Sequence, residues 1–310
     1  MLYLYKLNAH PGCLDAALSA GRFLTRTVWD PEIGLFPFEW DAPAGADKQL
    51  AYFFDCGIIV RGLLSLWRAT DDAEFLQVAE ACGRSMMTAF RAGSAIHPVL
   101  TLPAKEPLPW EDRWSRGPGC YQLKAAMAWH ELSQATGDAE FQKAYEQVLK
   151  QALPNNATFL TEEPDSERVM DRLHAYCYFL EGLMPCISEP ACQEAFVRGV
   201  RAVERLVNEI GPRFERSDVQ AQLLRVQLFG ARAGVVPFKY DLARERADRI
   251  ARFQVHSGEP SIQGGFAFGR LGEEVIPHIN PVSTTFCVQA LGWWSQFENG
   301  QFKPEPADLI

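Results

Sequence analysis

The heptapeptide Ala69-Thr70-Asp71-Asp72-Ala73-Glu74-Phe75 is nearly repeated as Ala135-Thr136-Gly137-Asp138-Ala139-Glu140-Phe141, 66 residues further along the chain (135 − 69). Each copy follows a nearly all-apolar helical pattern and precedes an amphipathic one. A joint of this kind connects the two helices of a hairpin. The sequence therefore predicts a fold made of repeated helical hairpins.

Two kinds of helix alternate along the chain. One kind has a single apolar stripe, as in 73–90, 139–153 and 191–210, and is expected to keep one face in water. The other kind is apolar almost all round and must be enclosed; it covers 50–67, 120–132, 173–187, 219–229 and 283–294. Counting from 13–29, this gives about five outer–inner pairs. We predict an all-α fold, an α/α toroid of about five to six helical hairpins, with an open superhelical solenoid as the alternative.

The composition fits one large helical domain. The chain has 310 residues, 47% of them hydrophobic, so we predict a single toroid domain over 1–310. Acidic residues number 39 against 30 basic ones, a net charge of −9, and no basic stripe is present. Phosphate backbones require such a stripe, so nucleic acid is not an expected partner.

The eight cysteines form no CxxC pair and have mostly apolar helical neighbours. This pattern is typical of buried free thiols in a reducing compartment, so we expect a cytoplasmic protein. We find neither a signal-peptide pattern nor an uncharged run of about 18 residues, so no membrane span is expected. Motifs for phosphate loops, serine hydrolases and zinc proteases are also missing, so we predict no cofactor and no metal.

Three long connections lead into enclosed helices, at 30–49, 91–119 and 257–282. They are rich in proline, glycine and aromatic residues, and loops of this length in a compact domain are usually functional or disordered. Their aromatic content argues against disorder. We therefore expect them to gather at one end of the ring, around a central cavity that would hold a ligand.

The run Asp55-Cys56-Gly57-Ile58-Ile59-Val60-Arg61-Gly62-Leu63-Leu64-Ser65-Leu66-Trp67-Arg68-Ala69-Thr70-Asp71-Asp72 resembles the inner helix and turn of the six-hairpin glycosidase-like superfamily. That superfamily includes glycoside hydrolases, sugar epimerases and neighbours of polysaccharide lyases. A second region is similar to the closing repeat of prenyltransferase and terpene-cyclase toroids. It consists of Gly264-Gly265-Phe266-Ala267-Phe268, Pro277-His278-Ile279-Asn280-Pro281 and Gln289-Ala290-Leu291. Both resemblances imply the ring architecture more than a reaction. Because neither the DxDD acid motif nor a prenyltransferase zinc set is present, the sugar-directed interpretation is favoured.

The segment Trp110-Glu111-Asp112-Arg113-Trp114-Ser115-Arg116 concentrates two carboxylates, two guanidinium groups and two indoles just ahead of an enclosed helix. Sugar recognition uses flat apolar faces for stacking and charged groups for hydroxyls. A rigid surface loop with solvated ion pairs is the structural alternative.

Asp55 lies in apolar surroundings close to the start of an enclosed helix. A desolvated carboxylate there would have a raised pKa and could donate a proton to a leaving oxygen. A helix cap or a buried pair with Arg61 would be the structural role of the same residue.

A second candidate group comes from the opening of the third enclosed helix, where the spacing places Asp171, His174 and Tyr178 along one face. We expect Asp171 to orient the imidazole and to raise its pKa. A histidine that is satisfied within the core is the alternative.

We therefore predict a carbohydrate-active enzyme that acts on a sugar or oligosaccharide by carboxylate acid–base chemistry, most simply a glycoside hydrolase, with sugar epimerase or lyase activity also open. The residues are compatible with two further functions, an isoprenoid-handling toroid and a non-catalytic binding toroid. The candidate catalytic residues are Asp55, Glu111, Asp112, Asp171 and His174. The candidate substrate-binding residues are Trp40, Trp110, Arg113, Trp114, Tyr121, Tyr176 and His278.

Overall fold

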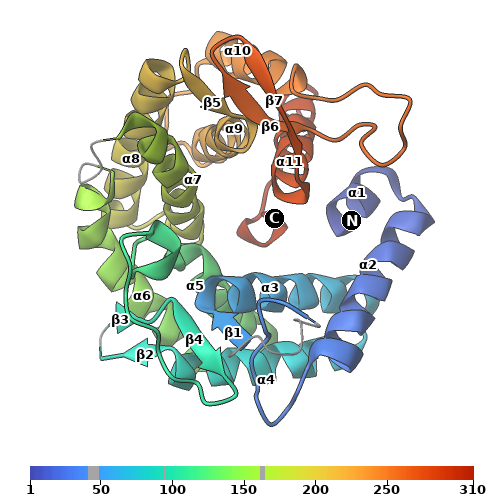
Figure 1. Ribbon diagram of the computed structural model, residues 1–310, viewed down its shortest axis with the longest axis vertical. Helices are drawn as coiled ribbons and strands as arrows, with labels where there is room; N and C mark the ends of the chain where they lie inside the picture. The colour runs from blue at the N-terminus through green and yellow to red at the C-terminus, as the bar shows by residue number, and fades with distance from the viewer. Residues whose placement is uncertain (41–48, 94, 161–164) are drawn as a thin grey trace. The chain divides into compact units, whose positions relative to one another are not determined.

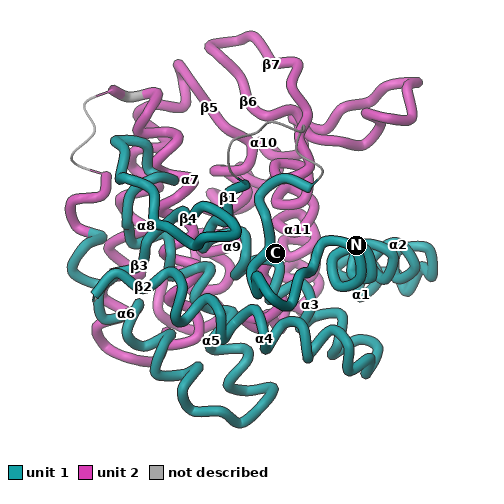
Figure 2. The backbone as a smooth tube through the Cα atoms, turned by 60° about the horizontal axis from the view of Figure 1, so that its bottom comes forward, with its two compact units in different colours: residues 1–156 teal, residues 157–310 magenta. Residues whose placement is uncertain are grey.

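The computed structural model describes residues 1–40, 49–93, 95–160 and 165–310. Its backbone contacts divide the chain into two compact units, residues 1–156 and 157–310, which Figure 2 colours separately. The boundary falls inside one long helix, α6 (Ala139–Phe159). Each unit has its own set of buried hydrophobic side chains.

The first unit is built from helical hairpins. Its helices are α1 (Leu2–Asn8), α2 (Pro11–Phe23, continued by a π-helical turn at Leu24–Val28), α3 (Phe53–Thr70), α4 (Ala73–Ala89), α5 (Gln122–Thr136) and most of α6. The enclosed helices α3 and α5 pack against each other, and α4 packs on α3 (Figure 1). Gly57 permits the close approach of α3 to α5, because a Cβ at this position would lie 2.6 Å from the backbone oxygen of Ala125.

The second unit continues the same alternation. Its helices are α7 (Ser166–Gly182), α8 (Pro190–Ile210), α9 (Ser217–Arg232), α10 (Tyr240–Ala251) and α11 (Pro281–Glu298), with short 3-10 turns at Met184–Cys186 and Pro306–Asp308. Helix α9 contacts both α7 and α11, while α8 covers α7 and α9, and α10 covers α9 and α11 (Figure 1). The predicted alternation of enclosed and one-sided helices is confirmed within each unit.

The two copies of the repeated joint have equivalent structures. The Thr70 and Thr136 hydroxyls donate to the carbonyl oxygens four residues earlier, each at 2.8 Å. The side chains of Asp72 and Asp138 cap the following helices by accepting from the backbone N–H groups two residues later, at 3.1 and 2.9 Å. Asp capping is a strong signal for a helix start, which is why the repeat marked the hairpins so clearly.

Each joint is also bound by an arginine from the preceding one-sided segment. Arg26 Nη2 lies 2.6 Å from Glu74 Oε2, and Arg84 Nη2 lies 2.9 Å from Asp138 Oδ2. A glycine on the same preceding helix makes room for the joint in both copies: a Cβ at Gly21 would touch Leu66 and Phe75, and one at Gly83 would touch their counterparts 66 residues on, Leu132 and Phe141. The repeat therefore extends from the joint to the helix packed behind it.

The long connections contain short strands, which the sequence did not predict. The strands are β1 (Gln49–Tyr52), β2 (Arg91–Ala92), β3 (Ala95–Ile96), β4 (Val99–Leu102), β5 (Phe214–Arg216), β6 (Ala267–Leu271) and β7 (Glu274–Ile279). Antiparallel pairing of β1 with β4 joins the approaches to α3 and α5, and the sheet β5-β6-β7 joins the approaches to α9 and α11. The 30–49 and 91–119 connections thus meet in the first unit, whereas the gathering of all three connections around one central cavity stays a prediction. Part of the 30–49 connection, residues 41–48, lies outside the described residues.

The enclosed helices carry buried polar groups that pair across helix boundaries. In the first unit, Arg61 of α3 binds Glu131 of α5 at 2.6 Å, and both side chains are buried. In the second unit, Arg225 of α9 binds Glu181 of α7 and Gln289 of α11, and all three side chains are fully buried. Because a buried charge is costly without a partner, these pairs fix which helices can be neighbours.

All eight cysteines lie in the described part of the chain, and none forms a disulfide; seven are buried and Cys13 is half-buried. None of the described helices has the length and apolar character needed to cross a membrane. Within the same described ranges, no group of three or more His, Cys, Asp or Glu side chains is arranged as a metal site.

Candidate functional site

Asp55 lies in the first turn of α3, directly after strand β1. The N-cap of this helix is Tyr52, which makes no side-chain cap, so Asp55 is not the capping residue. The buried pairing with Arg61 considered from the sequence is also not formed, because Arg61 binds Glu131. Within the part of the chain that the structure describes, no hydrogen bond or ion pair engages the Asp55 carboxylate.

Burial raises the pKa of Asp55 from its ordinary value of 3.8 to about 6. The helix N-terminus favours the ionised form, so desolvation outweighs it here. Two tyrosines lie within electrostatic range of the carboxylate: burial is the main cause that raises the pKa of Tyr52 and of Tyr121, and the charge of Asp55 raises each further. The close packing at Gly57 explains this grouping, because α3 and α5 begin side by side.

The loop 110–116 contributes to the same neighbourhood through Tyr52. The guanidinium carbon of Arg116 lies 5.3 Å from the centre of the Tyr52 ring. The positive charges of Arg116 and Arg113 lower the pKa of Tyr52, and the charge of Glu111 raises it, so all three are within electrostatic range of this phenol. Sequence segments separated by more than fifty residues thus meet beside Asp55.

Aromatic side chains line this neighbourhood. Trp114 packs edge-on against Tyr121 with ring centres 5.1 Å apart, and the Tyr121 hydroxyl donates to the Gly117 carbonyl oxygen at 3.0 Å. The other two predicted indoles have different neighbours: Trp110 is 56% exposed and its Nε1 lies 3.4 Å from His97 Nδ1, and Trp40 is 50% exposed and packs edge-on against Phe23. An exposed indole offers a flat apolar face on which a ligand can stack. Glu111, Asp112 and Arg113 are exposed as well.

In the second unit, Arg216 binds two carboxylates. Its guanidinium binds Asp218 through two hydrogen bonds of 3.0 and 2.7 Å and binds Asp171 at 2.6 Å. It also lies over the Phe268 ring at 4.6 Å. Asp171 keeps 51% of its side chain exposed, whereas Asp218 is buried. The Arg216–Asp171 pair is thus the point where this buried network reaches the surface.

His174 differs from its sequence-based prediction. Its Nδ1 lies 2.8 Å from Gln222 Oε1 and 3.7 Å from Asp218 Oδ2, and both of these residues belong to α9. The Gln222 amide nitrogen donates to the His174 carbonyl oxygen at 3.3 Å, which leaves the amide oxygen to accept from Nδ1. Burial lowers the pKa of His174 to about 4, although Asp218 opposes this. The expected rise in the pKa was wrong because desolvation outweighs the carboxylate.

Two other predicted contacts occupy contrasting places. Tyr176 is 3% exposed and stacks on Phe159, and a Cβ at Gly199 of α8 would touch its ring, so it lies within the packing of α7 against α8. His278 is exposed on β7, with its ring 6.0 Å from Phe268. Asn280 caps α11 by accepting from the Ser283 N–H at 2.7 Å.

The sequence analysis did not identify Tyr52, Arg216 and Asp218 as residues of the candidate sites. The triplet Arg216-Ser217-Asp218 did carry a signal, because two opposite charges stand at the entrance to an enclosed helix. Tyr52 carried none, since an aromatic residue in an aromatic run does not reveal which charges will surround it. The structure brings Asp55, Glu111, Arg113, Trp114 and Tyr121 together in the first unit and Asp171, His174 and His278 into one region of the second.

No family model and no curated protein matches the chain. Solved structures do. A sugar epimerase from a ruminal bacterium is 13% identical, with a TM-score of 0.68 over 94% of this chain and 84% of that chain. The cellobiose 2-epimerase of Spirochaeta thermophila is 14% identical, with a TM-score of 0.66 over 93% of this chain and 82% of that chain.

A third similar structure is the unsaturated glucuronyl hydrolase of a Bacillus species, 14% identical, with a TM-score of 0.51 over 96% of this chain and 72% of that chain. Identities this low establish the fold alone. The chain has an α/α toroid fold, as the sequence predicted.

Proposed function

We propose that this chain is a carbohydrate-active enzyme in which Asp55 donates a proton to a sugar oxygen. The observation that carries the proposal is the environment of Asp55: a half-buried carboxylate with a pKa of about 6 that no described cation neutralises. A catalytic acid works best when its pKa lies near the working pH, because it must hold its proton and still release it. Perturbed carboxylates of this kind concentrate at active sites.

The surroundings of Asp55 suit a sugar ligand. Tyr52 supplies a hydroxyl-bearing ring, Arg116 supplies a donor fork, and Trp114 supplies an indole that packs on the buried Tyr121. Pyranose rings present apolar faces and a rim of hydroxyls, so this mixture is complementary to them. The three similar structures reported above are a sugar epimerase, a cellobiose 2-epimerase and an unsaturated glucuronyl hydrolase, which supports the same substrate class.

Hydrolysis of a glycosidic bond is the reaction that we favour. It needs a protonated acid and a second carboxylate, and Glu111 is the carboxylate that shares the neighbourhood of Tyr52 with Asp55. Glu111 is exposed, so a water or a sugar can reach its carboxylate. Asp112, next to it in the chain, is the second candidate for this role.

Epimerisation or isomerisation of a free sugar is the second candidate function. The specific observation in its favour is that the epimerase structures give TM-scores of 0.66 and 0.68, against 0.51 for the glucuronyl hydrolase. Those reactions move a proton on carbon and need no second carboxylate. His174 is a poor base for this purpose, because it is buried with a pKa of about 4.

The test is an activity screen followed by NMR of the products. The purified protein is incubated with neutral and uronate-containing disaccharides and with free hexoses, and the anomeric signals are followed over time. New reducing ends indicate hydrolysis, whereas a new sugar with unchanged linkages indicates epimerisation or isomerisation. The Asp55→Asn variant is expected to lose at least about a hundredfold in kcat, the usual contribution of a catalytic acid.

Asp15→Asn is the matched control, because Asp15 is an exposed carboxylate of the one-sided helix α2. It should keep full activity. Full activity of Asp55→Asn on a sugar that the protein converts would contradict the role of Asp55. Conversion of prenyl diphosphates, with no sugar converted, would replace the whole proposal by an isoprenoid-handling function.

A further inference from the structure

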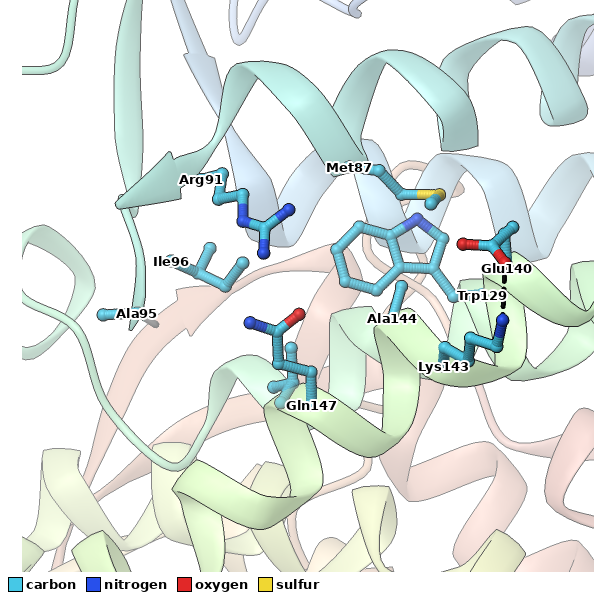
Figure 3. Close-up of a pocket in the computed structure, with 10 residues that line it drawn as sticks. Met87, Arg91, Ala95, Ile96, Trp129, Glu140, Lys143, Ala144 and Gln147 are labelled. Atoms are coloured by element: carbon cyan, nitrogen blue, oxygen red, sulfur yellow. Dashed lines mark hydrogen bonds and ion pairs between the residues drawn. The ribbon is translucent and has the colours of Figure 1, made fainter. Parts of the chain in front are cut away.

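A cavity of about 210 Å³ lies in the first unit, away from the Asp55 neighbourhood. Figure 3 shows it between the end of α4, the β2–β3 hairpin and the one-sided helix α6, with α5 behind. Its ten lining residues are Met87, Arg91, Ala95, Ile96, Trp129, Glu140, Lys143, Ala144, Gln147 and Val148. None of the groups proposed above for sugar chemistry is among them.

The floor of this cavity is apolar. Trp129 is 2% exposed, and its indole N–H is already used, because it donates to the Gly83 carbonyl oxygen at 2.9 Å. Trp129 therefore offers only carbon atoms to a ligand. Ile96 and Val148 are likewise buried side chains. A ligand on this floor would gain by removing apolar surface from water, not by hydrogen bonding.

The polar side chains of the cavity lie at its edge. Figure 3 shows the Arg91 guanidinium and the Gln147 amide on one side of the cavity, and the Glu140–Lys143 pair on the other. Lys143 Nζ lies 2.7 Å from Glu140 Oε1, so these two charges neutralise each other. Arg91 makes only one long hydrogen bond, from Nε to the Gly93 carbonyl oxygen at 3.5 Å, and no described carboxylate pairs with it.

The balance of charge at the cavity is therefore one guanidinium, unpaired among the described residues, beside an amide. A guanidinium presents a planar fork of donors that matches a carboxylate, and a charge-assisted pair of this kind is stronger than a neutral hydrogen bond. The protein as a whole carries a net charge of −9, which repels anions at long range. The guanidinium must supply the attraction locally, so binding should weaken as salt is added.

The size of the cavity and its apolar lining determine which anions could bind in it. A cavity of about 210 Å³ has room for a single ring with one substituent. A sugar ring would leave most of its hydroxyls against Met87, Ile96 and Trp129, where they find no partner. A ring without hydroxyls avoids this cost.

We infer that this cavity is a binding site for a small carboxylate carried on an apolar ring, with the ring on Trp129, Ile96 and Met87 and the carboxylate held by Arg91 and Gln147. The site is separate from the proposed sugar chemistry. A bound ligand would contact α4, the β2–β3 hairpin, α5 and α6, because these elements supply the lining residues.

The probe for the test is benzoate, measured by isothermal titration calorimetry on the full chain. Benzyl alcohol, which keeps the ring and lacks the charge, should bind roughly tenfold more weakly, since a hydrogen bond to a charged group is lost. Glucuronate, which keeps the carboxylate and adds hydroxyls, should also bind roughly tenfold more weakly, because its hydroxyls would stay unpaired.

Two variants separate charge from volume. Arg91→Gln should raise the dissociation constant of benzoate roughly tenfold. Ala144→Leu should abolish binding by filling the cavity while leaving Arg91 in place. Lys150→Gln is the control, because Lys150 is an exposed cation of α6 outside the cavity. Melting temperatures of all three variants verify folding.

Absence of benzoate binding to the wild-type protein in the millimolar range would overturn the inference. So would equal binding of benzoate by Arg91→Gln in a folded protein. Tighter binding of glucuronate than of benzoate would overturn the apolar-ring assignment. None of these results depends on whether the protein converts a sugar.

Discussion

Asp55 illustrates how position and not residue type decides what a carboxylate can do. It stands at the N-terminal end of α3, where the helix dipole favours negative charge, yet burial raises its pKa to about 6. Glu74 is also in the first turn of its helix, and the hydrogen bonds from Arg26 and Thr25 lower its pKa to about 2. The difference is the partner: Glu74 has an arginine and Asp55 has none among the described residues.

The unpaired state of Asp55 has a cost that can be measured. Its pKa is higher in the folded protein than the ordinary 3.8, so the folded state loses stability as the pH rises from about 4 through about 6. Asn cannot ionise. We therefore expect Asp55→Asn to be more stable than the wild type at pH 7 by about 1–3 kcal/mol, and equal to it near pH 4.

Urea unfolding at both pH values measures this difference. A variant that loses activity while gaining stability separates a functional residue from a structural one. Destabilisation of Asp55→Asn at pH 7 would mean that the carboxylate makes a stabilising contact, and it would remove the reason for assigning it proton transfer.

The raised pKa of Asp55 was predictable from the sequence because its cause is local. Asp55 stood out because it was a lone charge in an apolar run, and burial is what raised its pKa. His174 was predicted from its neighbour Asp171, three residues away, but its partners Gln222 and Asp218 come from another helix. A single sequence does not show which helix face will receive a side chain from 48 residues away, so this pairing was beyond reach.

At the scale of helices and turns, the repeated joint is the feature that defines the hairpins. Both copies use the same Thr and Asp hydrogen bonds, but they differ at the residue that leaves the first helix. Gly137 adopts a φ of 75°, and Asp71 adopts a φ of 56°. Left-handed backbone is strained for a residue with a Cβ and free of strain for glycine.

Replacing Asp71 by glycine should therefore stabilise the protein by about 0.5–1 kcal/mol, after the larger unfolded-state entropy of glycine is subtracted. The exposed Asp71 side chain makes no hydrogen bond to another described residue, so nothing else is lost. Thermal unfolding of Asp71→Gly and of the reciprocal Gly137→Asp gives the test, with the second variant expected to be destabilised. The same sign for both variants would contradict the equivalence of the two joints.

Close helix packing makes a second element-scale prediction at Gly57. A Cβ there would lie 2.6 Å from the Ala125 carbonyl oxygen and 2.7 Å from its Cβ, so α3 and α5 would have to separate. Gly57→Ala should cost about 1–3 kcal/mol, in spite of the higher helix propensity of alanine. Gly62→Ala on the same helix is the control, because nothing lies within 4 Å of its added Cβ, and it should be neutral or stabilising. Urea unfolding distinguishes the two.

The buried ion pair Glu181–Arg225 sets a third prediction at this scale. Glu181→Gln leaves the Arg225 guanidinium of α9 buried without its carboxylate and should cost about 3–5 kcal/mol. The double variant Glu181→Gln/Arg225→Met removes the orphaned charge and should recover most of this loss in the same urea experiment. Additive losses would show that the pair does not couple α7 to α9.

The helices were predictable and the strands were not, for one reason. Helix signals extend over ten or more residues, and the five enclosed and one-sided pairs gave consistent periodicities. The strands are two to six residues long and lie in connections rich in proline and glycine, where alternation cannot be recognised. The burial of Gln220, Gln222 and Arg225 in α9 was also not predicted. The leucines of this helix indicate that it is enclosed, but they do not show that its polar side chains find buried partners.

For the molecule as a whole, two buried groups impose opposite dependences of stability on pH. Ionisation of Asp55 is penalised, so its contribution falls between pH 3.8 and about 6. Burial lowers the pKa of His174 to about 4 from its ordinary 6.5, so the unfolded chain binds a proton that the folded one refuses, and the contribution of His174 rises with pH over nearly the same window. Each shift is close to two pKa units, or about 3 kcal/mol.

Because the two contributions nearly cancel in the wild type, single variants should expose them. From pH 4 to pH 6, the stability of Asp55→Asn relative to the wild type should rise, and that of His174→Asn relative to the wild type should fall, each by up to about 3 kcal/mol. Taking differences against the wild type removes the contributions of all other carboxylates. Melting temperatures measured every half unit of pH provide the curves, and the double variant should again follow the wild type. Curves that run parallel to the wild type for both single variants would mean that neither group is held away from water as the fold requires.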